Sequence, residues 1–421
     1  MKSVFKFTAL VLALLISAFL GYSFNKTDGN VLNNNKPQHT TEAVTYNSKR
    51  HLYFTPQENF VKYIGRSVYH DECLWFSMSG SGFEFITSSD KVDITFICDN
   101  AESLYNSHKP RVAVYVNGEL YFDETLKQKE ETFSFDISRH IGDKVVRVIK
   151  LSESMYSSCA VSKIAVYDNK DIAPTDKSDL KIEFIGDSIT AGYGIDEENS
   201  YGAFSTETEN FTKTYAYHTA EKLNADYSAI AFSGYGVLSG RSKTECVVPK
   251  YYEHAITNKE FDSPYPLYKW SFDKHQADVV VINLGVNDVS YCTTLIRKDS
   301  FIKEYKNFIG LIRWYNPQAH ILCVLGEVNN SMYPQIELAV KEFTEETEDK
   351  KVYCETLDFE MRSYTSAIDG HPCAESHEIA AENLTNMILN ILDGNFISSF
   401  EETTDDITED SSESETTEYL L

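Results

Sequence analysis

Basic residues are scarce in this chain. Its 421 residues include 38 lysines and arginines against 64 aspartates and glutamates, which gives a formal charge of −26. Without a basic excess there is no electrostatic source of affinity for nucleic acid, and an anionic membrane surface would repel the chain. The composition therefore excludes a general nucleic-acid binder and favours neutral or cationic partners.

Cysteine is also sparse, with eight residues spread along the chain at no framework spacing. A chain of this length can fold on its apolar core alone, and hydrophobic residues at 42% are sufficient to build that core. We expect most cysteines to be buried as small hydrophobic residues, although an exported protein could form one or two disulfides.

Long apolar runs are absent except at the N-terminus. An uncharged, mostly apolar stretch over residues 7–24 follows Lys2 and Lys6, which is the layout of an export signal. Residues 1–24 are predicted to be a cleaved signal peptide or an uncleaved membrane anchor, with a buried helix as the plainer alternative. The protein is thus expected to be secreted or anchored at the cell surface.

Two further segments lack the apolar residues that a core requires. Residues 25–50 are polar and without periodicity, which predicts a linker. Residues 400–421 are predicted to form a disordered acidic tail, because 401–418 carries nine acidic residues and no basic one.

Apolar residues alternate with polar ones between residues 51 and 168, as in Val92, Ile94 and Phe96. This period predicts half-buried strands, and Asn117-Gly118 tolerates the positive φ of a tight hairpin turn. The segment is expected to be an antiparallel β-sandwich domain. A polar stretch over 168–179 marks its end.

Strands and helices alternate over residues 180–395. Near-continuous apolar runs predict strands buried on both faces at 180–185, 226–232, 278–284, 320–325 and 351–354. Helical spacing appears over 301–312 and 377–391. The pattern predicts an α/β domain with a parallel sheet.

Polar residues with catalytic potential follow these strands. Ser188 comes directly after the first strand, where ligands collect in a parallel sheet. A serine needs a neighbouring base to act as a nucleophile, and His371, two residues after Asp369, precedes the last helix. The plainer alternatives are a helix-capping serine and a surface-loop histidine.

Two more strand ends carry groups that could stabilise negative charge. Asn287 offers a side-chain N–H, and Gly234 permits close approach of the backbone, although it could be only a turn glycine. Together the four segments favour acyl transfer. A zinc site at His371, Cys373 and His377 is a weaker reading because no second ligand pair is near, and His377 is expected to be packed in the fold.

These segments resemble a known family. The sequences around Ser188, Gly234, Asn287 and His371 are similar to the four blocks of the SGNH (GDSL-type) hydrolases, in their usual order. The preceding region resembles the N-terminal sandwich of carbohydrate esterase family two, through runs at 63–66 (Tyr-Ile-Gly-Arg), 75–77 (Trp-Phe-Ser) and 150–153 (Lys-Leu-Ser-Glu). The resemblance implies an SGNH-type three-layer parallel-sheet domain preceded by a jelly-roll-like sandwich.

The resemblance also implies roles for individual residues. Ser188 would be the nucleophile, His371 the general base and Asp369 its orienting acid, while Ser188, Gly234 and Asn287 would form the oxyanion hole. Some members hold the histidine through a backbone carbonyl instead of an aspartate. Many carry an aromatic residue where this chain has Gly370, so a sugar-stacking surface would be missing or supplied elsewhere.

The implied function is that of an extracellular serine esterase. It would remove O-acetyl groups from plant polysaccharides of the mannan or xylan type through an acetyl-serine intermediate, with no metal or organic cofactor. A lipid acyl-ester hydrolase, an acetyltransferase and a non-catalytic glycan-binding protein are the alternatives.

Overall fold

The computed structural model describes residues 51–99, 105–197, 199, 201–256, 268–326, 328–361 and 367–396. The predicted signal or anchor (1–24), linker (25–50) and acidic tail (400–421) lie outside these residues. In the described part of the chain, no helix combines the length and apolar content needed to cross a bilayer.

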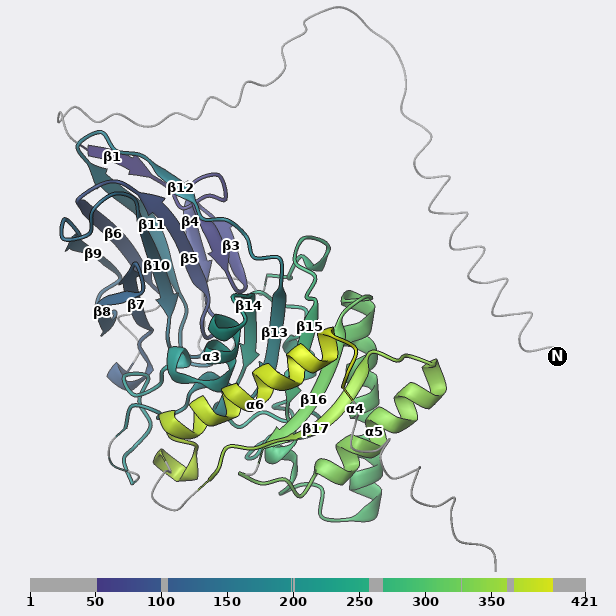
Figure 1. Ribbon diagram of the computed structural model, residues 1–421. Helices are drawn as coiled ribbons and strands as arrows, with labels where there is room; N and C mark the ends of the chain where they lie inside the picture. The colour runs from purple at the N-terminus through teal and green to yellow at the C-terminus, as the bar shows by residue number, and fades with distance from the viewer. Residues whose placement is uncertain are drawn as a thin grey trace, which may run out of the picture. The chain divides into compact units, whose positions relative to one another are not determined.

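Two antiparallel sheets form the first half of the described chain (Figure 1). One contains β1 (His51–Phe54), β3 (Ser67–His70), β4 (Cys73–Phe76), β6 (Lys91–Cys98), β9 (Glu130–Asp136) and β11 (Cys159–Tyr167). The other contains β2 (Lys62–Ile64), β5 (Gly82–Thr87), β7 (Arg111–Val116), β8 (Glu119–Thr125), β10 (Lys144–Lys150) and β12 (Ile172–Pro174).

The inner faces of both sheets share one core, as the alternating pattern requires. Phe96 of β6 and Phe83 of β5 are fully buried in the same apolar cluster. Asn117 and Gly118, with φ of 50° and 80°, form the predicted turn between β7 and β8. The predicted β-sandwich is confirmed.

The polar stretch after residue 168 contains a short strand that its sequence did not indicate. β12 pairs antiparallel with β5 at the edge of its sheet. A three-residue edge strand needs no apolar periodicity, and an edge tolerates Pro174 because that residue donates no ladder hydrogen bond.

A five-stranded parallel sheet follows, in the order β14-β13-β15-β16-β17. Its strands are β13 (Lys181–Gly186), β14 (Asp226–Ala231), β15 (Val279–Asn283), β16 (His320–Gly326) and β17 (Val352–Leu357). Alternate residues of β15 face opposite sides: Val280 packs with α4 (Leu295–Tyr315) and α5 (Tyr333–Thr347), and Val281 with α3 (Tyr215–Lys222) and α6 (Ala374–Leu392). This arrangement confirms the predicted three-layer α/β fold.

The predicted strands of this sheet and the helix α6 agree with the structure to within a few residues, while α4 begins six residues before its predicted spacing at 301. Two helices, α3 and α5, were not indicated by the sequence pattern. The reason is clear for α3, whose buried residues are Tyr215, Ala216, Thr219 and Ala220, a set too small and polar to give an apolar stripe.

The sandwich packs closely against the α/β domain. Gly80, with φ of 73°, faces the Phe211 ring so closely that a Cβ atom there would lie 2.3 Å from a ring carbon. The Tyr227 hydroxyl donates to the Gly80 carbonyl at 2.9 Å. Arg66, fully buried, forms an ion pair with Glu183 of β13 at 2.9 Å.

All eight cysteines are free, and five of them are buried. The expectation that most are small buried residues is confirmed. Burial raises the pKa of Cys323 to about 12, so this thiol stays protonated.

Candidate active site

Ser188 lies where β13 meets α2 (Ser188–Ala191), at the carboxyl end of the parallel sheet. The chain turns sharply there because Gly186 leaves room for Thr190: a Cβ on Gly186 would lie 2.0 Å from the Thr190 hydroxyl. Asp187 caps α2 by accepting from the Ile189 N–H at 3.0 Å, and Gly192, with φ of 84°, ends it. The turn points Ser188 out of the sheet edge.

His371 meets Ser188 across 183 residues of sequence. Its Nε2 lies 2.8 Å from the Ser188 Oγ, and its Nδ1 lies 3.0 Å from the carbonyl oxygen of Ile368. Because a carbonyl can only accept, Nδ1 carries the proton and Nε2 accepts from the serine hydroxyl. The pair has the geometry of a nucleophile and its general base.

Burial lowers the pKa of His371 from its ordinary value, while its backbone hydrogen bond to Ile368 opposes that shift. A neutral imidazole at neutral pH is the form that can take a proton from Ser188.

Asp369 lies beside the histidine without bonding to it. Its backbone is left-handed, with φ of 55°, and its carboxylate accepts from the Tyr193 hydroxyl at 3.2 Å. The Ile368 carbonyl occupies the position at Nδ1 where the expected orienting acid would bind. The alternative of a backbone carbonyl therefore describes the geometry better than a bond from Asp369.

Tyr193 was not singled out from the sequence. Its ring stacks on the His371 imidazole, with centroids 4.6 Å apart, and on Phe204 at 4.5 Å. Tyr156 of the sandwich stacks on Phe204 at 4.9 Å, so a continuous column of rings connects the sandwich to the histidine. No spacing rule predicts such a column, because its members lie on different loops.

Gly234 and Asn287 lie on neighbouring loops of the same sheet edge. Gly234 has φ of 78°, and a Cβ there would meet no atom within 4 Å, so open space adjoins this backbone. The Asn287 side-chain amide donates to the Asp187 carboxylate at 3.0 Å and to the Tyr235 carbonyl at 2.9 Å. An oxyanion beside Ser188 would compete with Asp187 for one of these N–H groups.

Asp288, next to Asn287, holds the loop that follows Gly234. Its buried carboxylate accepts from the N–H groups of Val237, Leu238 and Ser239 at 2.8 to 3.0 Å. Burial raises the pKa of Asp288 to about 6 even though these three bonds oppose the shift. No role for Asp288 was predicted from the sequence.

Burial also raises the pKa of Asp187 to about 7, with neighbouring Asp288 and Glu153 adding to the effect. Two buried carboxyl groups of the candidate site, those of Asp187 and Asp288, therefore keep their protons up to a higher pH than an exposed aspartate does.

His377 lies apart from the chemistry. It is fully buried, and its Nδ1 accepts from the Tyr215 N–H at 3.1 Å. The expectation of a packed histidine is confirmed. Since His371 binds Ser188 and His377 binds a backbone amide, the two do not converge as metal ligands, and no cluster of metal-ligating side chains occurs among the described residues.

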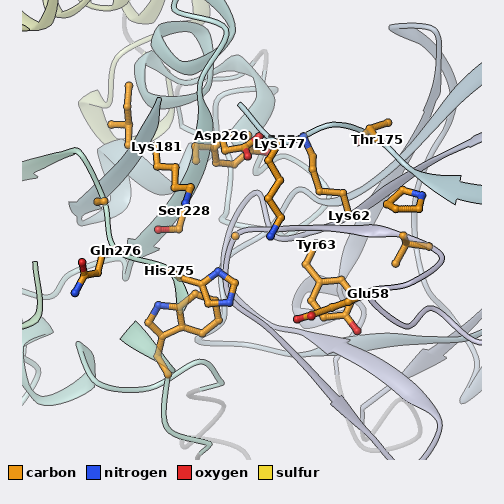
Figure 2. Close-up of a pocket in the computed structure, with 17 residues that line it drawn as sticks. Glu58, Lys62, Tyr63, Thr175, Lys177, Lys181, Asp226, Ser228, His275 and Gln276 are labelled. Atoms are coloured by element: carbon orange, nitrogen blue, oxygen red, sulfur yellow. Dashed lines mark hydrogen bonds and ion pairs between the residues drawn. The ribbon is translucent and has the colours of Figure 1, made fainter. Parts of the chain in front are cut away.

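A separate cavity of about 240 Å³ opens at the other edge of the sheet (Figure 2). It is lined by Lys181 and Asp226, which begin β13 and β14, and by Tyr63 and Trp270. Because Ser188 lies where β13 ends, this cavity and the candidate active site are at opposite ends of the strands.

The α/β part of the chain is similar to a known family. Residues 184–362 match the GDSL-like Lipase/Acylhydrolase family. The cellulase/esterase CelE of Acetivibrio thermocellus is 35% identical over 220 residues, which are 50% of this chain and 26% of CelE. The chain thus spans about a quarter of that relative's length.

A second relative covers more of the chain. The acetylxylan esterase / glucomannan deacetylase of Cellvibrio japonicus is 22% identical over 342 residues, which are 79% of this chain and 89% of that protein. These named relatives are carbohydrate esterases.

The fold has solved counterparts. A family two carbohydrate esterase from Clostridium thermocellum, solved in complex with cellohexaose, matches with a TM-score of 0.70 at 26% identity. The match covers 79% of this chain and 99% of that structure. Residues 184–362 thus resemble the GDSL-like Lipase/Acylhydrolase family, and the sandwich and α/β fold of the chain resembles that of a family two carbohydrate esterase.

Proposed function

We propose that this protein is a serine esterase that removes O-acetyl groups from polysaccharides of the mannan or xylan type. The observation that carries the proposal is the 2.8 Å contact between the Ser188 Oγ and the His371 Nε2, with Nδ1 fixed on a backbone carbonyl. The carbohydrate esterases among the relatives support an acetylated polysaccharide as the substrate.

The first half-reaction transfers the acetyl group to serine. His371 accepts the Ser188 proton as Oγ attacks the acetyl carbonyl carbon, and the carbonyl electrons move onto oxygen. The Ser188 N–H, which begins α2 and has no intrahelical acceptor, binds this oxyanion together with the Gly234 N–H and the Asn287 side chain. The tetrahedral species collapses as His371 returns the proton to the departing sugar hydroxyl.

The second half-reaction releases acetate. Water replaces the sugar, His371 takes one of its protons, and the resulting nucleophile attacks the acetyl-serine carbonyl. Collapse of the second tetrahedral species restores the Ser188 hydroxyl and frees acetate. Every step uses groups of this chain and water.

We further propose that the reaction takes place outside the cell, on the surface or after secretion. Residues 1–24 have the layout of an export signal, and a polymeric substrate has no route across a membrane to an enzyme inside.

The test uses the chain from residue 25 onward and aryl esters of acetate, butyrate and octanoate. We expect acetate to be hydrolysed fastest and Ser188→Ala to lower kcat by about 10⁴-fold or more. Acetylated glucomannan and acetylated xylan should then release acetate in the parent protein.

Other outcomes contradict the proposal in distinct ways. Unchanged turnover in Ser188→Ala would rule out the serine mechanism. A preference for octanoate would favour a lipid acyl-ester hydrolase, and glycan binding without any turnover would favour a binding protein. Acetyl transfer to an added sugar acceptor faster than hydrolysis would favour an acetyltransferase.

A further inference from the structure

A group of buried charged residues lies under the loop that carries Gly234. Its members are Lys150, at the end of β10, Glu153, in the connection to β11, and Glu209, before α3. All three are completely buried. The first two belong to the Lys-Leu-Ser-Glu run at 150–153, to which the proposed mechanism gives no task.

Hydrogen bonds connect this group to the peptide that precedes Gly234. The Glu153 Oε2 accepts from the Ser233 N–H at 2.8 Å. The Glu209 Oε2 accepts from the Glu153 N–H at 2.9 Å, and the Lys150 ammonium donates to the Glu153 carbonyl at 2.8 Å. The Glu153 side chain therefore connects the sandwich to the loop that carries Gly234.

Two buried carboxyl groups lie beside one another in this group. The Glu153 carboxyl group interacts with the carboxyl group of Glu209 and with Ser233. Burying one carboxyl group costs free energy, and burying two carboxyl groups beside one another costs more. Burial raises the pKa of Glu153 and lowers that of Lys150.

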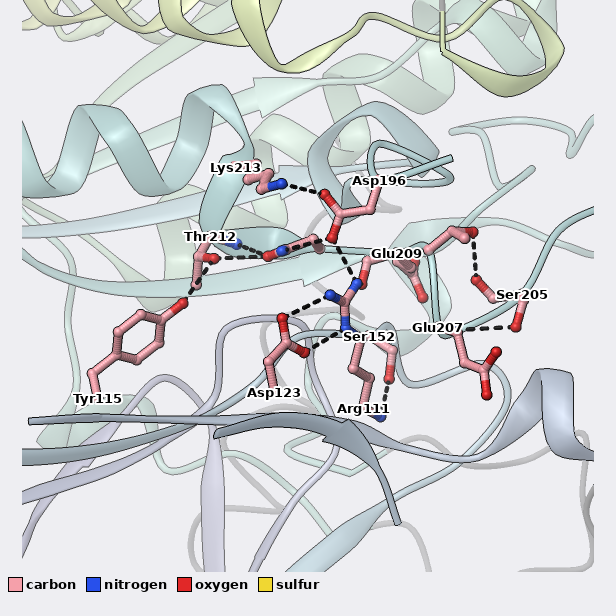
Figure 3. Close-up of polar contacts among 12 residues, drawn as sticks. Arg111, Tyr115, Asp123, Ser152, Asp196, Ser205, Glu207, Glu209, Thr212 and Lys213 are labelled. Atoms are coloured by element: carbon pink, nitrogen blue, oxygen red, sulfur yellow. Dashed lines mark hydrogen bonds and ion pairs between the residues drawn. The ribbon is translucent and has the colours of Figure 1, made fainter. Parts of the chain in front are cut away.

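Glu209 is fixed by a network that also joins the two domains (Figure 3). Arg111 of β7 donates to the Glu209 carbonyl at 3.2 Å and to the Asp196 carboxylate at 2.8 Å. It also binds both oxygens of Asp123 at 2.7 Å each. Asp196 in turn pairs with Lys213 at 2.6 Å. Arg111 thus holds the backbone of Glu209, the residue whose carboxylate accepts from the Glu153 N–H.

We propose that Glu153 is a positioning residue for the oxyanion hole, an inference that rests on the function proposed above. Its carboxylate fixes the Ser233 N–H and thereby orients the next peptide, whose N–H belongs to Gly234. The sandwich then takes part in catalysis without touching the substrate. Since the oxyanion forms only during the reaction, misplacing its donor lowers kcat and leaves KM nearly unchanged.

The test compares Glu153→Ala with Glu153→Gln in the chain from residue 25 onward. The glutamine keeps an oxygen that can accept from Ser233, whereas alanine removes it. We expect kcat for the aryl acetate to fall about 10- to 100-fold in Glu153→Ala, less than the loss of a whole oxyanion donor. In Glu153→Gln we expect kcat within about fivefold of the parent, and in both variants KM within about twofold.

Glu183→Gln is the matched control, because Glu183 is also a buried carboxylate where the two domains meet but binds Arg66, Ser228 and Tyr252. We expect it to lower the melting temperature while kcat per folded molecule stays that of the parent. A fall in kcat of equal size in this control, or a change in KM alone, would overturn the inference.

A second measurement does not depend on turnover. Hydrogen exchange of the segment 232–239 should speed up in Glu153→Ala and stay unchanged in Glu183→Gln. Unchanged exchange in a folded Glu153→Ala protein would overturn the positioning role. Ser188→Ala separates the two proposals: activity in that variant contradicts the serine esterase, whereas an inactive Ser188→Ala beside a fully active Glu153→Ala contradicts only the role of Glu153.

Discussion

Two buried carboxylate clusters lie where the sandwich meets the α/β domain, and they are built differently. Both oxygens of Glu183 are bonded, one to Arg66 and Ser228 and the other to Tyr252. Glu153 binds the Ser233 backbone N–H and lies beside a second buried carboxyl group, that of Glu209. Burial alone does not distinguish a structural carboxylate from a functional one. The hydrogen-bond partners of each carboxylate and their distance from the candidate active site make that distinction.

The largest expected effect comes from breaking the fully bonded cluster. Glu183→Ala leaves the Arg66 guanidinium buried without its counter-ion, which should cost about 3–5 kcal/mol of folding free energy. Because this ion pair does not contact Ser188 or His371, kcat per folded molecule should be unchanged. Urea unfolding and turnover measured on the same sample check the loss of stability and the unchanged kcat. A loss of kcat without a loss of stability would contradict the purely structural role of Glu183.

The buried His377 makes the stability of the protein depend on pH. Burial lowers the pKa of His377 to about 3, so the unfolded chain takes up this proton first as the pH falls below about 6.5. The stability that His377 contributes is therefore present above about pH 6.5 and is lost toward pH 3, by about 1.4 kcal/mol per pH unit.

His377→Gln should remove that part of the acid sensitivity. Urea unfolding at pH 7.5, 6.0 and 5.0 should show a shallower loss of stability in the variant than in the parent, with similar turnover at pH 8. Parallel stability curves for the two proteins would contradict the buried neutral histidine.

A smaller effect is expected at Tyr193, which contacts the catalytic pair through its ring. An aromatic face stabilises the imidazolium that His371 becomes during the reaction. Tyr193→Leu should lower kcat by about 10-fold and move the acid limb of the pH–rate profile to lower pH, because the protonated histidine loses that support.

Tyr193→Phe is the matched variant, since it keeps the ring and loses only the hydroxyl bonded to Asp369. Its kcat should stay within about threefold of the parent. A loss of kcat in Tyr193→Phe as large as that in Tyr193→Leu would mean that the hydrogen bond to Asp369, and not the ring, causes the effect. A full pH–rate profile of both variants distinguishes these two causes.

The sequence predicted the fold and the main pair of the site because both depend on local signals. Period-two alternation and buried apolar runs mark strands wherever they occur, and residues at the carboxyl ends of parallel strands must share one edge. This places Ser188 and His371 together before any coordinates are known.

What the sequence did not predict depends on backbone direction and on contacts between distant loops. The left-handed φ of Asp369 turns its carboxylate toward Tyr193 and leaves the Ile368 carbonyl at the imidazole, and a carbonyl has no residue signature. Likewise, Glu153 and Glu209 are 56 positions apart. No motif joins them.

The close contact at Gly80 bears on how such proteins can be rearranged. A single added methyl group there would collide with the Phe211 ring of the other domain. The domain boundary that composition suggests near residue 170 is consequently a poor site at which to join the sandwich of one protein to the α/β domain of another. Chimaeras that exchange the sandwich should carry Gly80 and Phe211 from the same parent, because the two surfaces are matched at the level of one atom.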